Sequence, residues 1–126
     1  MKTIPINIWD DYYEDGYVPE GEKQETYIYV EDDEMLLEDR KKCLEEVLIY
    51  IDNFHEFNKI KVYMSLYDSK IKYPKLTGPE HGDMHFKRWE IRVENMTHKM
   101  REKLVEKLNK ASLSINGVPF EIYSES

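Results

Sequence analysis

The segment HGDMH, residues 81–85, has the residue types and spacing of a metal site. His81, Asp83 and His85 alternate along the chain, and alternate residues of an extended chain point the same way. Imidazole and carboxylate groups are ligands of zinc and related divalent ions, so these three side chains could converge on one ion. Catalysis there would also need a general base and an open coordination position. We therefore keep a metal-dependent enzyme as an alternative to a polar loop that enters a strand.

The other reactive side chains form no catalytic pattern. Cys43 is the only cysteine, and it lies in the apolar stripe of a predicted helix, which favours a buried small hydrophobic residue over a nucleophile. Residues 11–22 match four positions of an EF-hand calcium loop, but Tyr13 and Pro19 stand where ligands are needed. Neither a glycine-rich phosphate loop nor a Gly-x-Ser-x-Gly turn occurs. We expect a non-enzymatic protein without a cofactor.

The acidic N-terminal stretch, Trp9–Glu34, holds the strongest functional signal. It contains eleven acidic residues, one basic residue and five of the ten tyrosines. Carboxylates steer a basic partner, and tyrosine supplies contact area at low entropic cost. The sequence therefore predicts a contact surface for a basic protein, unless the stretch folds back over its own sheet. The predicted contact residues are Trp9, Asp10, Asp11, Tyr12, Tyr13, Glu14, Asp15, Tyr17, Tyr27 and Tyr29.

Composition limits the other partners and the compartment. The chain has 126 residues and a net charge of −8, which disfavours nucleic-acid phosphates and anionic membranes. The single cysteine excludes an internal disulfide. The beginning of the chain lacks the apolar run of a signal peptide, and no segment approaches the ~20 apolar residues of a membrane span. We expect one cytoplasmic domain over residues 1–126.

Hydrophobic periodicity predicts seven helices and strands. Alternation indicates strands and a spacing of three to four residues indicates helices. Pro5 in the first strand predicts an edge position, because proline cannot donate to a strand ladder. A loop of some 17 residues follows the third strand. The predicted strands are 3–9, 25–30, 60–67, 85–94 and 118–123, and the predicted helices are 33–52 and 97–111.

Without the first strand, this order is the split βαβ–βαβ order of a ferredoxin-like sandwich. We expect an α+β fold with a mainly antiparallel sheet of four or five strands, two helices on one face, and an extra N-terminal strand. Alternation predicts the side chains on the uncovered side. These are Tyr27, Tyr29, Lys61, Tyr63, Tyr67, Arg88, Arg92, Glu121 and Tyr123.

Tyrosines interleaved with Lys61, Arg88 and Arg92 also suggest a sheet that binds single-stranded nucleic acid. Residues 59–110 hold thirteen basic and seven acidic residues, which fits this alternative. However, strand 85–94 lacks the glycine and the later aromatic residues of the RNP1 pattern. We therefore favour a sheet side that is covered by the acidic N-terminal stretch or by a second subunit in a homodimer.

Overall fold

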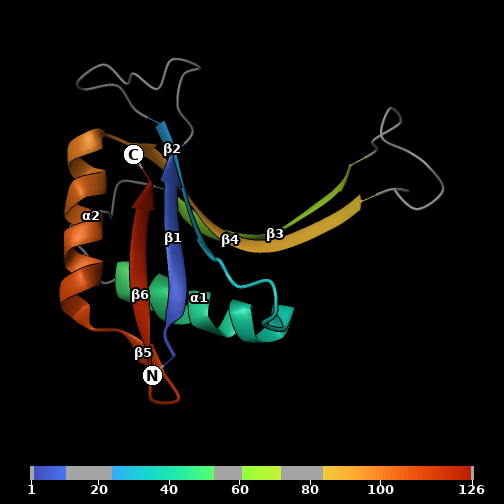
Figure 1. Cartoon of the computed structure of the whole chain (residues 1–126). Helices are drawn as coiled ribbons and strands as arrows, with labels where there is room; N and C mark the ends of the chain where they lie inside the picture. Colours follow the sequence, from blue (N-terminus) through green and yellow to red (C-terminus); the bar gives the residue numbers. More distant parts are fainter. Residues whose placement is uncertain (1, 11–23, 53–60, 72–83, 126) are drawn as a thin grey trace.

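The computed structural model describes residues 2–10, 24–52, 61–71 and 84–125. It has the α+β architecture that the sequence predicts, with two helices and a six-stranded, curled mixed sheet (Figure 1). The elements, in chain order, are β1 (Ile4–Asp10), β2 (Gln24–Val30), α1 (Leu37–Asp52), β3 (Val62–Ile71), β4 (Met84–Met96), α2 (His98–Ala111), β5 (Ser114–Ile115) and β6 (Val118–Glu125).

The strand order is β3-β4-β2-β1-β6-β5. A ferredoxin-like sandwich would pair β6 directly with β2, but β1 lies between them, antiparallel to β2 and parallel to β6. The ferredoxin-like sheet of four or five mainly antiparallel strands is therefore not confirmed. The extra N-terminal strand, β1, does not lie at an edge of the sheet. It lies inside the sheet, where it pairs with β2 on one side and with β6, the last strand of the chain, on the other.

The prediction that Pro5 marks an edge strand is wrong. The Pro5 carbonyl accepts a hydrogen bond of 3.0 Å from the Glu31 amide, just beyond the pair Ile6 and Val30. The amide nitrogen of a residue in a strand faces the same side as its carbonyl, so the absent N–H lies at the end of the β1–β2 ladder. Proline is tolerated at such a position even in an interior strand.

Both helices pack their apolar stripes against one face of the sheet. Cys43, Leu44 and Val47 of α1 are buried, together with Leu104 and Leu108 of α2. Their strand partners in the core are Ile4, Ile6, Ile8, Ile28, Val30, Ile91 and Val93. Each large side chain buried in this way contributes about 1.5–3 kcal/mol of transfer free energy, so the core accounts for the alternation in the strands.

Local hydrogen bonds set where the two helices begin. The Thr97 hydroxyl caps α2 by accepting a hydrogen bond of 3.3 Å from the Met100 amide. The first helix was expected from residue 33 but begins at Leu37, because Asp32 accepts from the Glu34 amide in a turn before it. Leu36 precedes the helix and is exposed.

The hairpin of β3 and β4 extends beyond the rest of the sheet. Its pairing runs from Val62–Val93 to Ile71–Met84, whereas the pairing of β2 with β4 ends at Ile28 and Ile91. Residues 65–71 and 84–90 therefore form a two-stranded arm that curves away from the central strands (Figure 1). Part of the predicted loop 68–84 is thus strand. In the described part of the chain, neither helix has the length and hydropathy needed to cross a membrane.

Candidate partner-binding surface

The open face is the side of the sheet that points away from α1. Its side chains come from five strands or their immediate ends, and residues paired across strands lie on the same side. All nine residues predicted for the uncovered side belong to it. The open face comprises Asn7, Trp9, Glu25, Tyr27, Tyr29, Lys61, Tyr63, Tyr67, Arg88, Glu90, Arg92, Glu94, Glu121 and Tyr123.

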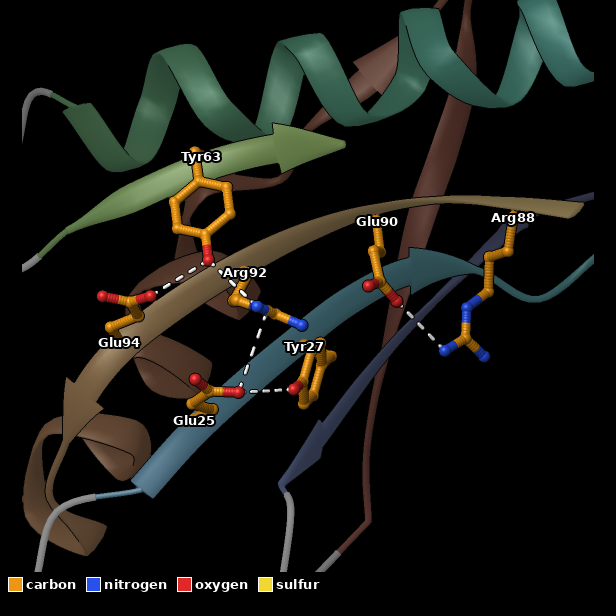
Figure 2. Close-up of polar contacts among 7 residues, drawn as sticks. All are labelled: Glu25, Tyr27, Tyr63, Arg88, Glu90, Arg92 and Glu94. Carbon is orange, nitrogen blue, oxygen red and sulfur yellow. Dashed lines mark hydrogen bonds and ion pairs between the residues drawn. The ribbon is translucent and has the colours of Figure 1, made fainter. Parts of the chain in front are cut away.

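Arg92 is the centre of the first polar network on the open face (Figure 2). Its Nη1 donates to the Tyr63 hydroxyl at 3.0 Å, and its Nε lies 3.8 Å from Glu25 Oε2. The Tyr63 hydroxyl donates to Glu94 at 3.0 Å, and the Tyr27 hydroxyl donates to Glu25 at 2.5 Å. The hydrogen bond to Tyr63 raises the pKa of Arg92 further above its ordinary value, so this guanidinium stays charged.

Arg88 forms the second network. Its Nη2 lies 3.1 Å from Glu90 Oε2, and its guanidinium stands 4.1 Å from the centre of the Tyr29 ring. Glu90 is only 4% exposed, and Asn7 is fully buried with its amide donating to the Tyr29 hydroxyl at 2.6 Å. The charged hydrogen bond between Arg88 and Glu90 is stronger than a neutral one, so it helps to fix the guanidinium that lies beside the Tyr29 ring.

Both arginines of the open face stand beside carboxylates. Three cationic side chains, Lys61, Arg88 and Arg92, stand among four carboxylates. Guanidinium groups also lie over the rings of Tyr27 and Tyr29. Bases stack on exposed aromatic faces, and phosphates need unpaired cations. A phosphate would therefore compete with carboxylates for Arg88 and Arg92.

Three predicted contact residues of the acidic N-terminal stretch come together on β1 and β2. Trp9 of β1 stands opposite Tyr27 of β2, with ring centroids 5.6 Å apart and planes tilted by 35°. Tyr29 follows on the same side of β2, opposite Asn7. Trp9 remains 36% exposed, so a partner could contact this aromatic group directly.

The structure describes the other seven predicted contact residues only in part. Asp10 ends β1, with its backbone opposite Thr26. The remaining six lie outside the described residues: Asp11, Tyr12, Tyr13, Glu14, Asp15 and Tyr17.

Sequence reasoning did not identify the groups that organise the open face. Asn7 and Glu25 were not singled out. Glu90 was not recognised as the partner of Arg88, nor Glu94 as the partner of the Tyr63 hydroxyl. Alternation did place Glu90 and Glu94 on the same side of their strand as Arg88 and Arg92. The individual contacts depend on side-chain rotamers and on long-range strand pairing, which a local pattern does not contain.

The proposed metal segment cannot be placed as a site. His81 and Asp83 lie outside the described residues, and His85 is described only as a β4 residue whose backbone pairs with Lys70. Within the described part of the chain, no group of three or more histidine, cysteine, aspartate or glutamate side chains could hold a metal.

Cys43 is a buried thiol, as the sequence predicts. Burial, helped by the charges of Asp39 and Glu46, raises its pKa to about 11. The thiolate is the nucleophilic form of cysteine, so this environment suppresses its reactivity.

Comparison with known proteins gives no relative from which a function could be transferred. No family model, curated protein or solved structure matches the chain.

Proposed function

We propose that the protein is a small, non-enzymatic module that binds a basic protein through the open face and the adjoining acidic N-terminal stretch. It would act as one cytoplasmic domain, in the manner of an inhibitor, an immunity protein or a nucleic-acid mimic. The observation that carries the proposal is the tilted pair of Trp9 and Tyr27. This pair stands where β1 leads into the acidic residues and β2 returns from them.

The two parts of this surface would contribute differently to binding. Tryptophan and tyrosine are enriched among the few interface residues whose truncation costs about 2 kcal/mol or more. Exposed carboxylates mainly accelerate encounter with a basic partner and select against acidic ones. Residues 1–34 hold eleven acidic and two basic residues, so they supply the steering charge beside an aromatic anchor.

Binding of single-stranded nucleic acid is the weaker alternative. Arg92 is bound to Tyr63 and close to Glu25, and Arg88 is bound to Glu90. A phosphate would have to displace these carboxylates from the arginines before it could bind there and release the counterions of the nucleic acid. A labelled single-stranded oligonucleotide that bound the protein at low salt, with affinity falling steeply as salt rises, would favour this alternative.

The acidic part of the surface is tested by charge reversal. Tagged protein is used to capture partners from its native host, and the captured proteins are identified by mass spectrometry. The test variant changes Asp10, Asp11, Glu14 and Asp15 to lysine. The matched control changes Glu38, Glu45, Glu46 and Asp52 of α1, all exposed, to lysine, which alters net charge by the same amount. We expect the test variant to lose a basic partner that the control retains; equal capture by both would contradict the proposal.

The aromatic part is tested by truncation. Trp9→Ala should weaken binding to the identified partner at least ~30-fold, the equivalent of about 2 kcal/mol, mainly through faster dissociation. Ile49→Ala is the control, because Ile49 is an exposed apolar residue on α1 and lies outside the proposed surface. Surface-based binding kinetics on both variants measure the effect. Similar dissociation rates for the two variants would remove Trp9 from the contact.

A further inference from the structure

Strand β3 is an edge strand of the described sheet, and its first six residues, 62–67, lack the usual protection of an edge; the charged residues Asp68 and Lys70 follow them. It is the outermost strand of the sheet and pairs with β4 on one side. Residues 62–67 read VYMSLY, a run without charge, proline or glycine in a chain that is 35% charged. Natural edges carry charges, prolines or bulges that prevent pairing with another chain. Such an unprotected edge is suited to accept another strand.

The opposite edge of the sheet shows the contrast. There, β6 begins with Val118 and Pro119, which pair with the two-residue β5. The short β5 therefore covers the start of β6, and Glu121 adds a charge just beyond it. This edge combines cover and charge, whereas residues 62–67 of β3 have neither charge nor proline.

On its outer side, the backbone of β3 has groups to which no described strand is paired. The Glu94 amide donates to the Lys61 carbonyl at 3.0 Å, so this pair bonds across β3 and β4. Hydrogen-bonded and non-bonded pairs alternate along an antiparallel ladder. The amides and carbonyls of Tyr63 and Ser65 therefore face β4, and those of Val62, Met64 and Leu66 face outward.

We propose that two copies of this chain pair antiparallel through their β3 edges, with the two-fold axis at Ser65. Tyr63 of one copy then stands opposite Tyr67 of the other on the open face, and Met64 stands opposite Leu66 on the helix side. The outward groups of Met64 and Leu66 supply the hydrogen bonds between copies. Leu66 and Tyr67 are 40% and 46% exposed in one copy. In the dimer, each gains a cross-strand partner from the other copy.

The chemistry of the edge favours a second copy over a different protein. From Tyr63 to Tyr67, residues equidistant from Ser65 are alike, aromatic with aromatic and apolar with apolar, so this five-residue run is complementary to itself in antiparallel order. No carboxylate lies between Val62 and Tyr67 to attract a basic strand. Pairing also turns the two-stranded arm, an arrangement of marginal stability by itself, into four strands. The isologous contact closes after two copies.

The β3 dimer does not depend on the proposed function, but it would enlarge the surface that the proposed function uses. An antiparallel pair about a two-fold axis normal to the sheet keeps equivalent faces on the same side. The open faces of the two copies therefore form one continuous surface, with the acidic N-terminal stretch of each copy two strands away from the β3 contact.

A cysteine at the two-fold axis tests the register. Ser65 would stand opposite its own copy in a non-hydrogen-bonded pair, where Cα atoms are roughly 4.5 Å apart, within the range of a disulfide. Under mild oxidation, Ser65→Cys should form a covalent dimer on a non-reducing gel. Tyr123→Cys is the control, because Tyr123 is exposed on the open face but lies on β6. The native Cys43 is buried. No cross-link at position 65, or an equal cross-link at position 123, would overturn the proposal.

Backbone pairing is tested by the oligomeric state in sedimentation. The wild type should sediment with twice the mass of one chain. Leu66→Pro removes an outward amide without touching the β3–β4 ladder and should give a monomer, whereas Leu66→Ala keeps the amide and should remain dimeric. Circular dichroism verifies the fold of each variant. A monomeric wild type would overturn the proposal, and so would a dimeric Leu66→Pro. If Leu66→Pro fails to fold, the cross-linking test still decides.

Discussion

At the scale of single residues, the Tyr63 hydroxyl connects the two charges of its network. It accepts from Arg92 and donates to Glu94, each at 3.0 Å. A hydroxyl is the only group at this position that can do both, since a carboxylate accepts only and a guanidinium donates only. The Tyr63 hydroxyl therefore bridges Arg92 and Glu94, two charged residues of β4 on the open face.

Tyr63→Phe tests this role. The substitution keeps the ring but removes the hydroxyl, and we expect the free energy of unfolding to fall by about 1 kcal/mol, the usual net value of a partly exposed hydrogen bond. Urea denaturation measures the change. Tyr123→Phe is the exposed comparison: its hydroxyl has a hydrogen bond with Glu121 at the surface, on a residue that is 45% exposed, and its loss should change stability by less than ~0.5 kcal/mol. Equal effects of the two substitutions would show that the Tyr63 hydroxyl adds nothing specific.

Cys43 predicts a dependence of stability on alkaline pH. Burial raises its pKa from an ordinary value of 9.0 to about 11, so the folded state holds the thiol proton more tightly than the unfolded state. The resulting stabilisation is complete below pH 9 and is lost as the pH rises through about 11. Urea denaturation at pH 9 and at pH 11 should therefore show a larger loss of stability for the wild type than for Cys43→Ala. Equal losses would contradict burial of the thiol.

At the scale of elements, α2 depends on its cap. Thr97→Ala removes the oxygen that accepts from the Met100 amide, and we expect a loss of about 1 kcal/mol in the free energy of unfolding. Thr97→Ser keeps the oxygen and should stay within a few tenths of a kcal/mol of the wild type. Thermal and urea denaturation of the two variants give the comparison. A Thr97→Ser protein as unstable as Thr97→Ala would assign the effect to packing of the methyl group.

The elements show which parts of the fold can be predicted from local pattern. Alternation is a property of each strand alone, so the two sides of β2, β3 and β4 were predicted correctly. The place of β1 between β2 and β6 depends on pairing with β6, more than a hundred residues later in the chain. Pro5 indicated an edge strand because proline lacks the N–H that an interior ladder needs. The sequence alone does not show that Pro5 lies at the end of the β1–β2 ladder, where that N–H is not required.

The candidate surface was predictable to a similar extent. Residue type singled out Trp9, Tyr27 and Tyr29, and the register of β1 and β2 places them side by side. Glu25 and Asn7 could not be assigned partners from sequence, because their contacts cross between strands or depend on rotamers. Recognising the uncharged edge of β3 requires both the run of uncharged residues and the strand order. The sequence contains the run, and the structure gives the order.

At the scale of the whole molecule, the two proposed contacts occupy different parts of one sheet. The acidic N-terminal stretch includes the end of β1 and all of β2, which are central strands, whereas β3 is the outermost strand beyond β4. A partner at the first site would therefore leave the second free. Both contacts share the open face, so a dimer would present two copies of the Trp9–Tyr27 pair to its partner.

Hydrogen exchange should detect the β3 contact in the intact protein. The amides of Tyr63 and Ser65 face β4 and are protected in any folded copy, whereas the amides of Met64 and Leu66 face outward, where no described strand of the same copy pairs with them. We expect exchange at Met64 and Leu66 to slow as protein concentration rises, and exchange at Tyr63 and Ser65 to change much less.

The Leu66→Pro protein gives the matched comparison, because its remaining outward amide at Met64 should exchange rapidly at every concentration. Residue-resolved exchange by nuclear magnetic resonance measures all four amides in one experiment. If the Met64 amide of the wild type is unprotected even in concentrated solution, β3 is a free edge. If it is equally protected at all dilutions, other parts of the same chain must cover that edge.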